Sequence, residues 1–180
     1  MLFGLLVFAA IIAIVFSFVG TYNRLVAAAD KARRAWNDLD ALLRQRHDEI
    51  PKVIEVCEPH LAHERALFDR LLETRAAVFA ARQTRDADAL SRAERSLRAA
   101  AAELVIDRAA KVSALAASPA FGLLRQRHAT LDLELAQRRD GYNSAVRDYN
   151  AAIGRLPGSL VALVGEFPPL RPLEFEPSGT

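Results

Sequence analysis

The sequence has few of the residue types on which catalytic and binding sites commonly depend. Of its 180 residues one is cysteine, four are histidine, and 7% are aromatic. The single Cys57 excludes an intramolecular disulfide and is expected to be a small buried hydrophobic residue. A glycine-rich phosphate loop, a Ser–His–Asp constellation and a pair of catalytic carboxylates are all missing from the pattern. We therefore expect no enzymatic activity, no catalytic residues and no cofactor.

A large excess of either charge is also missing. The 24 basic and 22 acidic residues nearly cancel, and no stripe of basic residues is interleaved with aromatic ones. Nucleic acid is therefore not expected as a partner. Hydrophobic residues make up 52% of the chain, which is enough for a packed core and argues against disorder.

Charge is wholly absent from residues 2–19, where thirteen residues are Leu, Ile, Val or Phe. Eighteen helical residues span about 27 Å, close to the roughly 30 Å hydrocarbon core of a bilayer. Residues 20–22 can complete the crossing, with Tyr22 at the interface. The pattern predicts a transmembrane anchor over residues 1–21, with the lipid bilayer as partner of residues 2–21. A cleaved signal peptide is the alternative, but it would need a basic segment before the apolar run.

The charges that follow the apolar run predict its orientation. Arg24, Lys31, Arg33 and Arg34 lie just beyond it, and only the terminal amine precedes it. Under the positive-inside rule the bulk of the chain lies in the cytoplasm and the N-terminus lies outside.

Beyond the anchor, the apolar residues follow a heptad-like, coiled-coil-type repeat. The first stripe consists of Tyr22, Leu25, Ala29, Ala32, Trp36, Leu39 and Leu43. It predicts a helix continuous with the anchor as far as Pro51. Pro51 either kinks or breaks this helix. We expect a break, because an unbroken rod from Tyr22 to Arg82 would be too long to fold back on itself.

Three more helices are expected, over residues 51–82 with a bend at Pro59, over 87–117, and over 121–153. No strand pattern is present, and the connections are short enough to join antiparallel neighbours. The expected fold is therefore all-α, with an N-terminal transmembrane helix continuing into an antiparallel up-and-down four-helix bundle. The expected parts are the anchor (1–21), the bundle (22–156) and a Pro-rich C-terminal coil (157–180). A short apolar run at 160–164, with Phe167, is expected to cover the bundle base or to enter the membrane interface.

Some ionisable residues fall on the predicted apolar stripes. Because a buried ionic group must be paired, we hypothesise an interhelical network of Glu64, Arg75, Asp132 and Arg139 that sets helix register. In the alternative, the stripes drift and these charges reach water. His60, His63 and Glu64 share one helix face, which permits metal ligation only with a ligand from another helix, such as His128. A solvated polar pair is the alternative there.

Short motifs are distributed over nearly the whole chain, at positions that include Tyr22, Asn23, Trp36, Pro51, His63, Tyr142, Asn143, Tyr149 and Asn150. Taken together, these motifs resemble those of the LemA family of bacterial membrane proteins. A Tyr-Pro-x-Leu segment usual in such chains is not found at residues 113–121, and Asp132 stands where a Glu is expected. The resemblance implies a single-pass protein of the bacterial cytoplasmic membrane with a four-helix bundle and no established biochemical activity.

Three functions follow as hypotheses. The first is a non-catalytic interaction or scaffold module with a membrane or membrane-associated protein partner. The second is a metal- or small-ligand-binding membrane protein that uses the His63/Glu64 region. The third is an envelope structural protein that oligomerises through the Ala-rich helix at 87–117.

Overall fold

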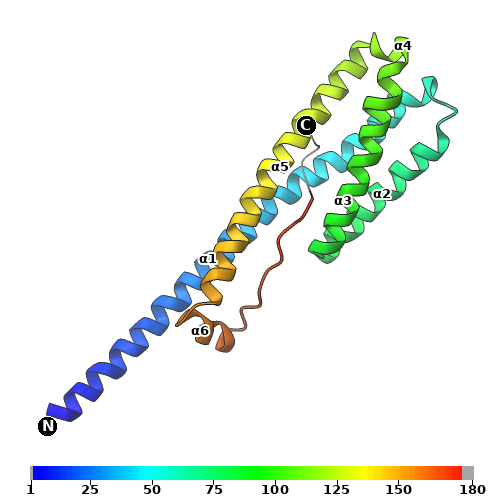
Figure 1. Ribbon diagram of the computed structural model, residues 1–180. Helices are drawn as coiled ribbons and strands as arrows, with labels where there is room; N and C mark the ends of the chain where they lie inside the picture. The colour runs from blue at the N-terminus through cyan, green and yellow to red at the C-terminus, as the bar shows by residue number, and fades with distance from the viewer. Residues whose placement is uncertain (1, 176–180) are drawn as a thin grey trace. The chain divides into compact units, whose positions relative to one another are not determined.

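The computed structural model describes residues 2–175, and this part of the chain is helical with no strand (Figure 1). The longer helices are α1 (Leu2–Cys57), α2 (Arg65–Thr84), α3 (Ala87–Ala102), α5 (Pro119–Ile153) and α6 (Gly158–Val164). Shorter elements connect them: η1 (Glu58–His60), η2 (Glu103–Arg108), η3 (Ala109–Lys111) and α4 (Ser113–Ala116). The all-α class and the long apolar N-terminal helix are confirmed.

The chain divides into two compact units, each built from segments that are distant in sequence. The first unit comprises residues 2–36 together with Gly141–Pro172. The second comprises Asn37–Asp140 together with residues 173–175 of the described chain. Helices α1 and α5 each contribute to both units. This division differs from the single helical body expected over residues 22–156.

The predicted break at Pro51 is wrong, because α1 continues through this proline to Cys57. A proline inside a helix has no N–H, so the carbonyl four residues earlier loses its helical donor. That carbonyl belongs to His47, and the Arg75 side chain of α2 supplies the missing donor through Nε at 2.9 Å. The chain turns instead at residues 58–64, around Pro59, and the helix predicted over 51–82 is therefore only its second part, α2.

The helix predicted over residues 87–117 is also interrupted. Helix α3 is followed by a π-helical turn, η2, and then by the short elements η3 and α4. Leu97, Ala101 and Leu104 are buried at helical spacing, which would next turn Arg108 inward. The extra residue of the π turn shifts this phase by one position. As a result Ala109 is buried and Arg108 is exposed.

The core of the second unit follows the apolar stripes of its helices. Fully buried leucines come from α1, α2, α3 and α5, and include Leu39, Leu43, Leu71, Leu90, Leu97, Leu131 and Leu135. Cys57 is buried with them, as expected from the sequence. Helices α2 and α3 pack side by side (Figure 1). Asp86 caps α3 by accepting a hydrogen bond from the Ala89 N–H at 2.9 Å.

The predicted coil over residues 157–180 is wrong at its start, because Gly158–Val164 form helix α6. The run is short, but Val161 is fully buried and secures the helix to the rest of the first unit. Packing therefore supplies the stability that seven residues cannot obtain alone. Residues 165–175 have no regular secondary structure, as expected. Residues 176–180 of the predicted coil lie outside the described residues.

Candidate functional site

In the first unit, polar side chains of α5 hold an extended segment, residues 168–171, which we call the strap. The Tyr149 hydroxyl donates to the Pro168 carbonyl at 2.9 Å. The Asn150 side chain donates to the Leu170 carbonyl at 2.7 Å and accepts from the Leu170 N–H at 3.0 Å. Two turns earlier along this face, the Tyr142 hydroxyl donates to the Arg171 carbonyl at 3.1 Å. Three of the family-motif positions therefore act together by fixing the strap to α5.

This part of α5 also packs against α1. The Trp36 and Tyr142 rings meet edge to face with centroids 5.4 Å apart. Lys31 and Asp148 form an ion pair at 2.8 Å between half-exposed side chains. Burial raises the pKa of the Tyr142 hydroxyl, which keeps it protonated as a hydrogen-bond donor. Of the other motif positions, Asn23 is exposed and Asn143 is partly buried.

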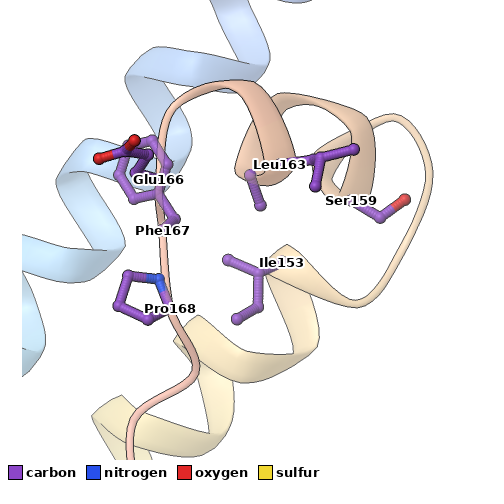
Figure 2. Close-up of a pocket in the computed structure, with 7 residues that line it drawn as sticks. Ile153, Ser159, Leu163, Glu166, Phe167 and Pro168 are labelled. Carbon is purple, nitrogen blue, oxygen red and sulfur yellow. The ribbon is translucent and has the colours of Figure 1, made fainter.

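Helix α6 packs closely against the end of α5. A Cβ placed on Gly158 would lie 2.1 Å from the Ala152 carbonyl oxygen, so no larger residue fits without a shift. Beside α6 is an open groove of about 570 Å³ (Figure 2). Its labelled lining residues come from α5, α6 and the segment that leads into the strap: Ile153, Ser159, Leu163, Glu166, Phe167 and Pro168.

In the second unit, the central feature is a buried arginine, Arg46 of α1, with a side chain 1% exposed. Its Nη1 donates to Oε2 of Glu94 on α3 at 2.9 Å, and Glu94 is fully buried. Its Nη2 donates to Oδ1 of Asp132 on α5. Two carboxylates from two helices thus share one guanidinium, an arrangement that ties three helices at one level.

Burial controls the protonation behaviour around this cluster. It raises the pKa of the Glu94 carboxyl, against the opposing effect of Arg46, and the negative charge of Asp132 raises it further. His128 lies 3.7 Å from Asp132, and burial lowers the pKa of its imidazole. The cluster therefore holds Arg46, two carboxyl groups and a histidine that favours its neutral form. The positive charge of Arg98 also acts on it and opposes the rise in the pKa of Glu94.

The four residues of the hypothesised network do not form one network in the structure. Asp132 belongs to the Arg46 cluster, and Arg139 lies with its guanidinium 5.5 Å from the centre of the Phe175 ring. Glu64 instead pairs with Arg108 at 3.3 Å, and Arg75 with His47.

The reasoning from sequence missed Arg46 and Glu94, although their positions carried a signal. Each continues an apolar stripe at helical spacing, Arg46 after Leu43 and Glu94 after Leu90. A search for charged residues on the stripes of every helix would have found both.

The His60, His63 and Glu64 group shows little organisation. The His63 side chain is 75% exposed and its Nε2 lies 3.9 Å from Glu64. Within residues 2–175 no group of three or more His, Cys, Asp or Glu side chains is arranged to hold a metal ion. The polar groups that are organised join α5 to the strap in the first unit and join helices to one another in the second.

Comparison with known proteins assigns the chain to a family. No curated protein matches the sequence. The sequence model of the LemA family, in contrast, matches residues 35–179, which include the described part of the second unit, all of α5 and the strap that Tyr149 and Asn150 hold. This match covers well over half of the chain and confirms the resemblance found in the motifs, so the chain belongs to the LemA family.

Proposed function

We propose that this LemA family protein is a single-pass protein of the bacterial cytoplasmic membrane, anchored by residues 2–21, and that its helical units serve as a non-catalytic interaction or scaffold module. One observation carries the anchorage. All side chains of residues 2–19 are exposed, and this part of α1 is long and apolar enough to cross a membrane. A soluble protein rarely leaves a continuous apolar surface of this size uncovered.

We further propose that the helical segments of the second unit form an antiparallel up-and-down four-helix bundle. The order of the interhelical contacts supports it. Along α1, Asp40 pairs with Arg82 and the later His47 with the earlier Arg75 of α2. The contacts of α1 with α5 run in the same inverse order, through the pairs Asp38–Arg138, Arg46–Asp132 and Glu49–Arg127.

An interaction role is supported by the kind of residue that these units organise. The buried polar groups join helices to each other or to the strap, and the conspicuous apolar surfaces face outward. Such an arrangement favours a rigid surface for binding a partner over a catalytic site. The cytoplasmic orientation is supported by the basic residues that follow the apolar run.

The anchorage and orientation can be tested in isolated membranes and spheroplasts with a cysteine variant, Leu133→Cys, since Leu133 is exposed and the native Cys57 is fully buried. The protein should resist extraction from membranes by alkaline carbonate. A membrane-impermeant maleimide should label the variant in inverted membrane vesicles but not in spheroplasts. Labelling in spheroplasts would reverse the orientation, and release by carbonate would overturn the anchorage.

The interaction role requires a different test. Photo-crosslinkers placed at exposed positions of α2 and α3, such as Leu72 and Arg92, should capture a partner in living cells. Products that contain a different membrane or membrane-associated protein support a scaffold. Products that contain only copies of this chain support the oligomeric envelope protein instead, and metal bound in stoichiometric amount to the purified protein would favour the ligand-binding alternative.

A further inference from the structure

Helix α6 presents an apolar face that no part of the described chain covers. Leu160, Leu163 and Val164 are 58%, 80% and 74% exposed, and their spacing places them on one face of the helix. Val161 is fully buried on the other side, and α6 contains no charged residue. Three large aliphatic side chains exposed together on seven residues form a surface suited to an apolar environment.

The contacts of the first unit place this face beside the end of the apolar part of α1. Phe167, three residues after α6, packs edge to face on Tyr22, with ring centroids 5.6 Å apart. Tyr22 follows directly on residues 2–21, and it remains 43% exposed. The Phe167 N–H donates to the Ala162 carbonyl of α6 at 3.1 Å, so the ring and the helix are held together. Figure 1 shows α6 beside α1 in this unit.

We infer that α6 is an interfacial membrane helix. Its side chains Leu160, Leu163 and Val164 then enter the leaflet on the Tyr22 side of the membrane, where the segment 2–21 ends. This inference rests on the proposed membrane anchorage. A lipid surface is the occupant that fits, because the face is apolar and the Tyr22–Phe167 contact holds α6 next to the residue at which the apolar segment of α1 ends. Exposed Arg24, two residues after Tyr22, and exposed Arg155, three residues before α6, supply cations for lipid phosphates.

The groove next to α6 agrees with this placement. Ile153, Leu163, Phe167 and Pro168 give it a largely apolar lining, and it is open rather than enclosed (Figure 2). An open apolar groove beside a helix at the interface can accept part of an acyl chain. A water-facing groove of this composition would instead leave the same side chains hydrated.

Depth measurement on the full chain in vesicles of phosphatidylcholine and phosphatidylglycerol tests the inference. A nitroxide is attached to one introduced cysteine at a time, in Leu163→Cys, Val15→Cys and Leu133→Cys. The fully buried Cys57 does not compete for the label. Val15 reports the anchor, and Leu133 is a matched control, a leucine 62% exposed in the second unit. Collisions with oxygen report lipid, and collisions with a soluble nickel chelate report water.

We expect the oxygen-to-nickel collision ratio at position 163 to exceed that at 133 several-fold and to approach that at 15. A ratio at 163 equal to that at 133 would place α6 in water and overturn the inference. Few collisions with either reagent at 163 would reveal a protein cover and overturn it equally. If position 15 itself resembles 133, the proposed anchorage has failed, which is a separate outcome. A label at Leu160 repeats the measurement without altering Leu163.

Discussion

Replacing Arg46 by methionine should be among the most destabilising single changes in the second unit. The substitution keeps most of the aliphatic volume but removes the cation that two carboxylates share. Glu94 is fully buried, so water cannot solvate its charge once Arg46 is removed. Two charge-assisted hydrogen bonds are lost, one to Glu94 and one to Asp132. Removing one member of such a buried pair costs about 3 to 5 kcal/mol.

The assay is urea unfolding of the full chain in mild detergent, followed by circular dichroism at 222 nm. Arg44→Met is the matched control: it removes an arginine two residues away, 68% exposed and paired with Asp40 across one helical turn. Because Arg44 is exposed and Asp40 keeps its pair with Arg82 in this variant, the loss should be about 0.3 to 0.5 kcal/mol, as is typical of a pair across one helical turn. The double variant Arg46→Met, Glu94→Gln should recover much of the loss, because it removes the buried charge that the single variant leaves behind.

The effect should also depend on pH in a defined direction. Burial already raises the pKa of Glu94 in the folded protein, and removal of Arg46 raises it further. A carboxyl with a folded pKa above its unfolded value binds its proton more tightly in the native state. The penalty in Arg46→Met is therefore complete above the raised pKa and falls by up to about 1.4 kcal/mol per pH unit as pH drops through it. A cost no larger than that of Arg44→Met, independent of pH, would refute the buried cluster.

Three further predictions test other features. Arg75→Leu should lower the free energy of unfolding by about 1 kcal/mol in the native background but by clearly less in Pro51→Ala, because an alanine N–H restores the helical donor to the His47 carbonyl. In a double-mutant cycle measured by unfolding, the effects of Pro51→Ala and the exposed control Arg70→Leu should add. If the effects of Pro51→Ala and Arg75→Leu also add, Arg75 does not replace the missing donor. Asn150→Leu removes two hydrogen bonds to Leu170 and should speed amide hydrogen exchange in the strap, whereas exposed Asn37→Leu should not; unchanged exchange in both would show that the strap is held by other contacts. Burial raises the pKa of Cys57 to about 11 from an ordinary 9.0, so at pH 8 its thiolate fraction is lower by roughly a hundredfold. Maleimide labelling should accordingly be slow until urea unfolds the chain, and reaction in the folded protein as fast as that of free cysteine would contradict its burial.

The features that periodicity predicts well are those with long, uninterrupted stripes. The expected helix over 121–153 corresponds to α5, and the stripe from Leu25 to Leu43 is buried as its spacing indicates, except that Ala29 is partly exposed. The turn near residues 83–86 was also predictable, and α2 and α3 meet there through Arg85, in a left-handed conformation, and the capping Asp86. These features depend on local sequence, where side-chain spacing decides which face is buried.

The features that failed depend on contacts between distant residues. Whether Pro51 breaks α1 is decided by Arg75, twenty-four residues away, which provides the donor that the proline lacks. The π turn after α3 is favoured because it buries Ala109 and leaves Arg108 exposed, whereas a continuous α-helix would turn Arg108 into the core. Neither partner can be identified from the local pattern. The polar cluster was missed for a simpler reason, because Arg46 and Glu94 lie on stripes otherwise filled by apolar residues.

The way α5 holds the strap has a consequence for how its sequence can vary. Tyr149, Asn150 and Tyr142 form these hydrogen bonds with main-chain atoms of residues 168–171, so the bonds themselves do not select the side chains of the strap. What they do require is an N–H at position 170, which Asn150 accepts. Prolines at 168, 169 and 172 restrict the backbone to extended conformations without removing that donor. Most replacements within the strap are therefore tolerated, whereas a proline at position 170 is not.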